Sequence, residues 1–193
     1  MSKTWKLVLG IIATVVVANV LLFILLETVF ATAPISAGDA VYSSTDGSDR
    51  EKECTIGYTS EKVALTAGHC VEAGQSVQNS KGEYVGKASR LPDRDIALIN
   101  REPFKSGEVQ SPSFGGAVVG DSVCMTSRIL GARSCGEVTR IDSFRVEVTP
   151  ALRGMAGDSG AGIIKNDEVV GIYTGNVKSE TDDVLYSTFS LAP

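Results

Sequence analysis

The sequence is poor in residues that bind metals and in positive charge. It contains one histidine, His69, and its four cysteines include no pair with C-x-x-C spacing, which argues against a structural zinc site. Basic residues number 18 and acidic residues 23, for a formal net charge of −5. A nucleic-acid partner favours a basic surface. We therefore expect neither a metal nor a nucleic acid.

Long apolar runs are also scarce, and the exception lies near the N-terminus. Residues 7–26 carry no charge and follow Lys3 and Lys6. At about 1.5 Å per residue they span roughly the 30 Å of a bilayer core. The run fits a secretory signal peptide, with residues 31–33 (ATA) as the cleavage motif, or an uncleaved signal anchor. A buried soluble helix is a third alternative.

The two lysines place the N-terminus in the cytoplasm under either membrane-related alternative. The predicted division is a signal peptide or signal-anchor transmembrane segment over 1–34 and an exported part over 35–193. We expect that part to be secreted or anchored at the outer face of the cytoplasmic membrane through residues 7–26. Pro34, directly after the cleavage motif, slightly favours the anchor.

Sustained helical periodicity is missing from the exported part. Short apolar or alternating stretches recur between turn residues instead. In one of them Phe144, Val146 and Val148 alternate with Arg145 and Glu147, the period of a half-buried strand. The pattern predicts an all-β sandwich or barrel. Residues 111–120 are the best candidate for a join between two halves. Further strands are expected over 62–67, 83–89, 95–100, 121–127, 161–165, 168–174 and 184–190.

All four cysteines, Cys54, Cys70, Cys124 and Cys135, lie in the exported part. An even number in an oxidising compartment indicates two disulfides. Three pairings can be drawn. The local one, Cys54–Cys70 with Cys124–Cys135, closes two short loops.

The stretch GMAGDSGAG, residues 154–162, surrounds Ser159 with glycines. It fits a glycine-rich hairpin turn. It also fits a turn that carries a nucleophile. In such a turn the N–H groups of Gly157 and Ser159 can point into one small space, as an oxyanion hole requires.

A serine nucleophile needs a base, and the base needs a carboxylate that sets its tautomer. His69, in LTAGHC, is the available imidazole, although a lone histidine is more often incidental. PDRDIALIN supplies Asp93 and Asp95. We prefer Asp95, because it opens an apolar strand, whereas Asp93 is expected to be solvated in the turn.

LTAGHC, DIAL and GDSG, in that order, resemble the chymotrypsin family. The order excludes an α/β-hydrolase, in which the serine comes first within G-x-S-x-G. The similarity is to the small bacterial branch of streptogrisins and alpha-lytic protease, through ISAGDAVYSS, VGDSVCMTSRILGARSCGEVT and GIYTGN.

The resemblance implies two antiparallel six-stranded β-barrels, about 35–110 and 111–193, with the active site between them. It implies peptide-bond hydrolysis through an acyl-enzyme by a serine-type endopeptidase without a cofactor. In this scheme His69 is the general base, Asp95 orients it, Ser159 is the nucleophile, and Gly157 and Ser159 form the oxyanion hole. It also implies the local disulfide pairing. Protein or peptide substrates and a monomeric state are expected.

The resemblance further implies that a primary pocket is lined by Gly154, Met155, Ala156, Thr174, Gly175 and Asn176. Asn176 occupies a position where a glycine would leave the entrance of this pocket open. We expect a small or medium apolar residue before the cut, or an acidic one if Arg153 points inward.

We expect Asp158, beside the predicted nucleophile, to be buried, and a buried charge needs a partner. In the relatives that the chain resembles an arginine supplies it, and Met125 stands at that position here. Arg128, or another nearby arginine, is the predicted substitute, and a freed amino terminus is the second choice.

Two other functions fit the sequence less well. One is a catalytically silent homologue that serves as an extracellular binding module, although the triad is intact. The other is a stress-type protease of the high-temperature-requirement kind, for which the sequence leaves no peptide-binding domain.

Overall fold

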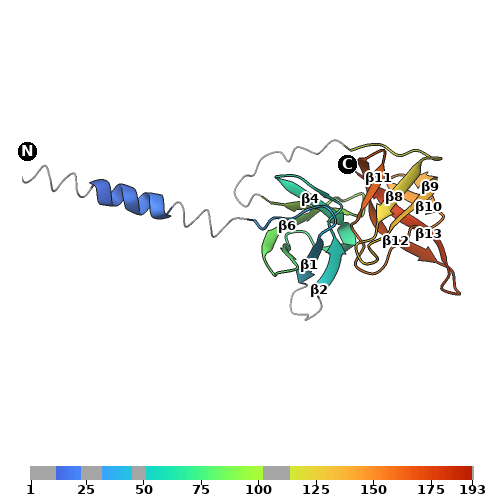
Figure 1. Cartoon of the computed structure of the whole chain (residues 1–193), viewed down its shortest axis with the longest axis horizontal. Coiled ribbons are helices and arrows are strands. Elements are labelled where there is room, and N and C mark those ends of the chain that lie inside the picture. Colours follow the sequence, from blue (N-terminus) through green and yellow to red (C-terminus); the bar gives the residue numbers. More distant parts are fainter. Residues whose placement is uncertain (1–11, 23–31, 45–50, 102–113, 193) are drawn as a thin grey trace, which may run out of the picture. The chain divides into compact units, whose positions relative to one another are not determined.

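The computed structural model describes residues 12–22, 32–44, 51–101 and 114–192. Contacts divide the chain into one unit over residues 1–31 and another over 32–193. In the first unit, residues 12–22 form a helix with exposed apolar side chains (Figure 1). No helix within the described residues has the length and hydropathy to cross a membrane. The rest of the apolar run 7–26 lies outside the described residues.

The described part of the second unit consists of two antiparallel sheets (Figure 1). The first sheet has the strand order β2-β1-β5-β6-β7-β4-β3, and the second is a closed barrel with the order β10-β13-β12-β11-β8-β9. The strands of the first sheet are β1 (Ala40–Ser44), β2 (Glu51–Thr55), β3 (Tyr58–Thr59), β4 (Val63–Ala67), β5 (Ser76–Asn79), β6 (Tyr84–Arg90) and β7 (Ile96–Asn100). Those of the barrel are β8 (Ser122–Thr126), β9 (Arg133–Asp142), β10 (Arg145–Thr149), β11 (Gly162–Lys165), β12 (Glu168–Lys178) and β13 (Val184–Leu191).

The all-β prediction is confirmed, and the second half is the six-stranded barrel that the resemblance implied. The first half is a seven-stranded sheet that begins with β2 and ends with β3. Only Ile56 and Gly57 separate these two strands in the chain, and their N–H groups donate to the carbonyls of Asp39, just before β1, and of Leu65, in β4 (2.9 Å each). One bent segment, residues 51–59, therefore joins β1 to β4, in keeping with the fold that the resemblance implied. At the end of β2, the N–H of Thr55 donates to the carbonyl of Ser159 in the second half (2.8 Å).

Each half has its own apolar core. The first includes Leu65, Ile96 and Ile99, and the second includes Val146 and Phe189. The alternation predicted for β10 is confirmed, because Val146 and Val148 are buried between exposed Arg145 and Thr149. Alternation therefore identified the strand face that builds a core.

The chain passes from one core to the other within the predicted join. Phe114 packs edge-on against Tyr58 in the first half, with ring centroids 5.1 Å apart. Ala117, three residues later, belongs to the second core. The crossover between cores therefore falls between these two residues.

Both disulfides of the local pairing are present. Cys54–Cys70 joins β2 to the short 3-10 helix η1 (Gly68–Cys70), and Cys124–Cys135 joins directly opposed residues of β8 and β9. The first bond thus reaches the segment that carries the single histidine.

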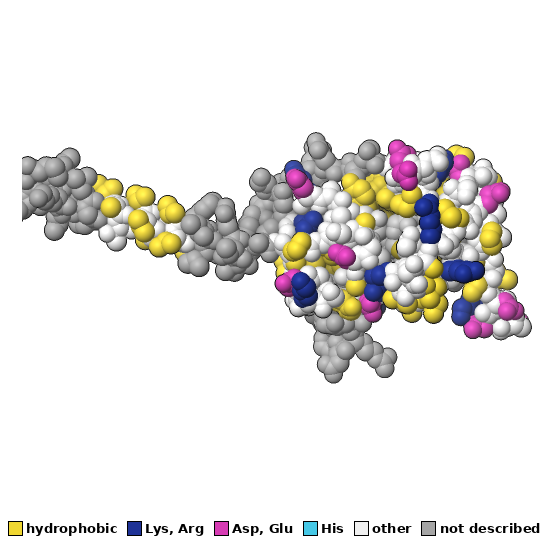
Figure 2. Space-filling model, viewed as in Figure 1, with side chains coloured by type: hydrophobic (Ala, Val, Ile, Leu, Met, Phe, Trp, Pro, Cys, Tyr) yellow, Lys and Arg dark blue, Asp and Glu magenta, His cyan; other side chains and the backbone are white. Residues whose placement is uncertain are grey.

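The segment that precedes β1 packs on the first sheet. Ala33 is buried, its N–H donates to the carbonyl of Tyr84 (2.7 Å), and its carbonyl accepts from Arg101 Nη2 (3.1 Å). Residues from Thr32 onward therefore belong to the folded unit. The face of this unit seen in Figure 2 carries charged side chains of both signs.

Candidate active site

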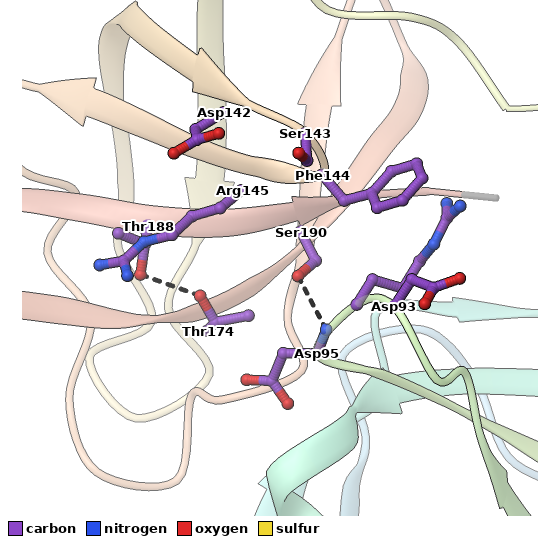
Figure 3. Close-up of a pocket in the computed structure, with 10 residues that line it drawn as sticks. Asp93, Asp95, Asp142, Ser143, Phe144, Arg145, Thr174, Thr188 and Ser190 are labelled. Carbon is purple, nitrogen blue, oxygen red and sulfur yellow. Dashed lines mark hydrogen bonds between the residues drawn. The ribbon is translucent and has the colours of Figure 1, made fainter.

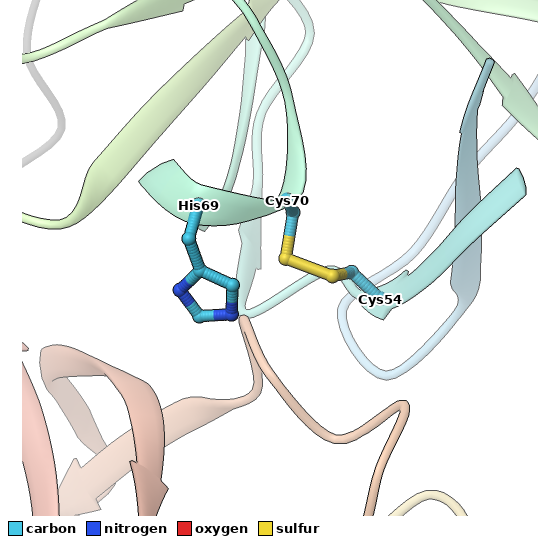
Figure 4. A group of neighbouring side chains, drawn as sticks. All are labelled: Cys54, His69 and Cys70. Atoms are coloured by element: carbon cyan, nitrogen blue, oxygen red, sulfur yellow. A yellow bond between two sulfur atoms is a disulfide. The ribbon is translucent and has the colours of Figure 1, made fainter. Parts of the chain in front are cut away.

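His69 lies in η1, directly after buried strand β4 (Figure 4). Its neighbour Cys70 is bonded to Cys54 on β2, and Lys52 Nζ donates to the carbonyl of His69 (3.2 Å). The imidazole is about half-exposed, with 45% of the side chain accessible. A covalent link and a hydrogen bond thus hold the backbone of His69, while its ring faces solvent.

Asp95 immediately precedes β7, which pairs with β4 so that Ile96 lies opposite Ala67. This register brings the carboxylate to His69. Oδ1 accepts from the backbone N–H of His69 (2.6 Å), and Oδ2 lies 2.7 Å from Nδ1. Gly68 makes the approach feasible, because a Cβ there would lie 2.8 Å from Oδ1. Asp95, rather than Asp93, is therefore the aspartate that contacts the histidine.

The pKa of Asp95 is lowered relative to its ordinary value. Partial burial raises it, but the hydrogen bonds and charge of His69, with a smaller contribution from the charge of Arg90, outweigh the burial. An ionised carboxylate accepts a hydrogen bond from the N–H at Nδ1 and thereby favours the imidazole tautomer with an unprotonated Nε2. That tautomer can take a proton from a nucleophile.

The other predicted aspartate makes no hydrogen bond to His69 within the described residues. Exposed Asp93 lines a pocket of about 420 Å³ together with Asp95, Phe144 and several hydroxyl side chains. Its carboxylate points away from that of Asp95 in Figure 3. Ser190 Oγ accepts from the N–H of Asp95 (3.2 Å) at the edge of this pocket.

Ser159 follows a tight turn in which the N–H of Asp158 donates to the carbonyl of Met155 (3.0 Å). Gly157 has φ +96° and Gly160 has φ +97°. A Cβ on Gly160 would lie 2.1 Å from the carbonyl oxygen of Thr55 and 2.3 Å from Thr66 Oγ1. Glycine is therefore required where the turn packs on the first sheet.

The turn leaves two backbone donors unused. Among the described residues, neither the N–H of Gly157 nor that of Ser159 has a protein acceptor. Two such donors beside a serine match what an oxyanion hole needs.

Ser159 lies against the histidine segment through its backbone. Its carbonyl accepts from the N–H of Thr55 (2.8 Å) and lies 4.0 Å from Cys70 Sγ. No hydrogen bond between Ser159 Oγ and His69 Nε2 occurs within the described residues. Catalytic hydrogen bonds are often long before substrate binds.

Asp158 is fully buried, but the prediction that Arg128 pairs with it is wrong. Its carboxylate accepts from Ser127 Oγ (2.6 Å) and from the N–H groups of Met155 (2.9 Å) and Ile129 (3.2 Å). These donors are neutral, and no ion pair to Asp158 occurs in the described part of the chain. Arg128 pairs with Glu53 of β2 instead.

The predicted primary-pocket residues only partly come together. Asn176 Nδ2 donates to the carbonyl of Gly154 (3.2 Å), and its Oδ1 accepts from Ser187 Oγ. Ser187 Oγ also accepts from the N–H of Leu152 (2.7 Å). The Asn176 side chain therefore bridges the segment before Ser159 and strand β13.

Other members of that set lie apart. Thr174 Oγ1 lies 2.9 Å from Thr188 Oγ1 and lines the pocket beside Asp95, while Met155 is 52% exposed. Gly175 has φ +146°, and Ala156 is exposed. Arg153 is exposed, with its N–H bonded to Ser134 Oγ (2.9 Å).

Tyr173 backs the segment before the serine. Burial, followed by the negative charge of Asp158, raises the pKa of Tyr173 to about 12, and a hydrogen bond with Ser187 offsets this only in part. The hydroxyl thus stays protonated and acts as a neutral polar group behind Gly154.

Sequence reasoning missed several polar contacts. Thr55, Ser127, Ser187 and Ser190 each bond a segment of the candidate site. The only sequence feature that could have indicated these contacts is the group of hydroxyl residues in β13. These residues are buried despite their polarity.

Cys54, His69 and Cys70 present possible metal-ligand atoms within 4.8 Å of one another (Figure 4). Both sulfurs belong to one disulfide, so neither supplies the thiolate that a zinc site needs. This cluster therefore does not fit a metal centre.

No family model matches the chain, and no curated protein matches its sequence. Solved structures do match. The Nocardiopsis protease NAPase has a TM-score of 0.58 at 20% identity, covering 82% of this chain and 93% of its own. Thermobifida fusca protease A gives 0.57 at 21% identity, covering 82% and 92%. Cellulomonas bogoriensis chymotrypsin gives 0.56 at 23%, covering 82% and 91%.

The chain therefore has the fold of the bacterial chymotrypsin-like serine proteases, and the resemblance seen in the sequence is confirmed at the level of the fold.

Proposed function

We propose that this chain is a serine endopeptidase that hydrolyses peptide bonds through an acyl-enzyme. The observation that carries the proposal is the contact between His69 Nδ1 and Asp95 Oδ2 (2.7 Å), next to a serine turn with two unused N–H donors. The fold shared with known serine proteases supports it.

In the first half of the reaction, His69 Nε2 takes the proton of Ser159 Oγ as the oxygen attacks the substrate carbonyl carbon. Ionised Asp95 holds the Nδ1 proton and stabilises the imidazolium. The N–H groups of Gly157 and Ser159 donate to the oxyanion of the tetrahedral intermediate. His69 then protonates the leaving amine as the C–N bond breaks.

In the second half, His69 removes a proton from a water molecule that attacks the acyl-enzyme. The ester bond to Ser159 breaks, and the histidine returns the proton to Oγ. The balanced reaction consumes one water and yields a carboxylate and an amine, and no cofactor is needed.

We further propose that the residue before the cut is apolar and small or medium in size. Support comes from Asn176, whose side chain bridges Gly154 and Ser187 where a glycine would leave space. Exposed Arg153 does not point to an acidic preference. In peptide-library profiling, Asn176→Gly should extend cleavage to larger apolar residues, while Arg153→Gln should leave the profile unchanged. A strict preference for lysine or arginine in the wild type would contradict this assignment.

The folded unit acts outside the cytoplasm. Its two disulfides support this, because such bonds persist in oxidising compartments. We expect the uncleaved protein to fractionate with membranes and to resist carbonate extraction. Recovery of the whole population in the medium, starting near Ile35, would establish secretion instead.

The proposed activity is tested with a fluorophosphonate probe and peptide mapping of the label. We expect a single adduct on Ser159, strongly reduced in His69→Ala and absent in Ser159→Ala. A folded wild-type protein that takes no label and cleaves no peptide would contradict the proposal and favour a binding module.

A further inference from the structure

The end of strand β2 touches both halves of the candidate site. Cys54 is bonded to Cys70, next to His69, and the N–H of Thr55 donates to the carbonyl of Ser159 (2.8 Å). The carbonyl of Thr55 accepts from Thr66 Oγ1 (2.9 Å) on β4. β2 is thus held to the histidine segment on one side and to the serine turn on the other.

The side chain of Thr55 reaches the serine turn as well. Thr55 is 1% exposed, and its hydroxyl donates to the carbonyl of Gly157 (2.7 Å). The same oxygen accepts from Arg128 Nε (3.2 Å). Because a guanidinium can only donate, the hydroxyl proton is left for Gly157.

Arg128 is oriented in turn by Glu53. Its Nη2 donates to Glu53 Oε1, and Glu53 lies two residues before Thr55, on the same face of β2. The planar guanidinium therefore spans two side chains of one strand. It also lies over the turn, since Nη2 is 3.1 Å from where a Cβ on Gly157 would be.

These contacts hold Gly157, which is the residue of the turn with the greatest conformational freedom. Gly157 has φ +96°, and its N–H is one of the two unused donors, whereas its carbonyl is the group that Thr55 holds. Glycine rotates readily between conformations, so an anchored carbonyl restricts the direction of the N–H. Asp158 next to it has neutral donors only, whereas Arg128, which lies over Gly157, is paired with Glu53.

We infer that Thr55, and Arg128 oriented by Glu53, are positioning residues for the Gly157 peptide and hence for the oxyanion hole. This inference rests on the proposed function. The Arg128–Glu53 pair is partly exposed, with 23% and 40% of the side chains accessible, so it adds little stability by itself. Its role is to direct the Thr55 hydroxyl.

The test compares Thr55→Val, which keeps the shape and removes the hydroxyl, with Thr55→Ser, which retains it. Loss of an oxyanion-hole donor lowers kcat by about 10²–10³-fold. A donor that is present but misdirected should lower kcat by about tenfold or more. We expect Thr55→Val to lower kcat to that extent with KM within about twofold, and to weaken binding of a peptide boronate in parallel. Thr55→Ser should restore both.

Glu53→Gln and Arg128→Lys alter the partly exposed Arg128–Glu53 pair. These two variants test the inference even if Thr55→Val does not fold. Each should lower kcat about threefold or more without changing how kcat/KM depends on pH, because the His69–Asp95 pair is untouched. Arg140→Met is the matched control, since Arg140 is 64% exposed and pairs with other surface carboxylates. Unchanged kcat and boronate affinity in all three network variants would overturn the inference.

A readout that needs no activity separates this inference from the proposed function. In protein labelled with ¹⁵N-glycine, the Gly157 amide signal should shift in Thr55→Val and stay in place in Thr55→Ser. If the wild type is inactive but that signal shifts, the proposed function fails and the positioning role stands. If the wild type is active and the signal is unmoved, only the positioning role fails.

Discussion

The barrel of the second half closes through hydrogen bonds between separate strands, whereas in the first half the two ends of the sheet, β2 and β3, belong to one bent segment of the chain, residues 51–59. The candidate site lies beside this bend. Thr55, at the end of β2, donates its N–H to the carbonyl of Ser159, which belongs to the second half. The comparison shows that the first half uses the bend between β2 and β3 to bond its neighbour, whereas the ring of the second half is made of separate strands.

Each half contributes one aspartate to the candidate site, and the two aspartates have different hydrogen-bond partners. In the first half, Asp95 contacts the imidazole ring of His69. In the second half, fully buried Asp158 has Ser127 Oγ and two backbone N–H groups as donors. The first arrangement suits proton transfer, and the second suits a rigid turn.

The largest expected effect tests whether the halves act as one unit. His69→Ala removes a side chain of the first half and Ser159→Ala one of the second. Each should lower kcat on the order of 10⁶-fold, and the double variant should lose little more, because such residues act together. Steady-state kinetics on a peptide amide checks this. Losses that multiply in the double variant would mean that the two halves act independently.

The next effect separates two aspartates of the first half. Asp95→Asn should lower kcat by about 10³–10⁴-fold, because an amide stabilises the wrong imidazole tautomer. Asp93→Asn is the matched control, and its exposed carboxylate does not contact His69. We expect its kcat/KM to stay within about twofold of wild type. Equal losses in both variants would contradict the assignment of Asp95.

The two disulfides sharpen the comparison further. They close segments of 16 and 11 residues, so replacing either pair by alanine should lower the free energy of unfolding by about 3 kcal/mol in a chain-entropy argument. Only the Cys54/Cys70 variant should also lower kcat, because that bond connects β2 to the His69 segment.

Denaturant unfolding measures the stability of both disulfide variants, and kcat is normalised to the fraction that fluorophosphonate labels. A Cys124/Cys135 variant that loses as much kcat per labelled molecule would show that the two bonds are equivalent.

The smallest expected effect is a loss of stability at acid pH, to which one aspartate of each half contributes. The pKa of Asp95 is lowered by His69, and that of Asp121 by a hydrogen bond from Lys165. A lowered pKa favours the ionised form in the folded state. This contribution is full above the unfolded value of about 3.9 and is lost as the pH falls through the lower folded value.

Unfolding of wild type, Asp95→Asn and Asp121→Asn near pH 7 and near pH 2 checks this dependence. Each variant should differ from wild type at the higher pH and approach it at the lower one. Only Asp95→Asn should affect activity at neutral pH. A stability difference that is equal at both pH values would contradict the linkage.

Much of the architecture could be predicted because it depends on local pattern. Alternation located β10, and apolar stretches located strands such as β4 and β7. β9 was not predicted, since its exposed polar residues break the apolar pattern.

The residue types that this chemistry needs can be read from the chain alone: one imidazole, a serine between glycines, and an aspartate at the start of an apolar strand. Their partners depend on the folded arrangement. Arg128 pairs with Glu53 and not with Asp158, and Thr55 bonds Gly157 across 102 positions of sequence. Such choices depend on distances between the two halves, which packing of the cores sets and no local pattern encodes.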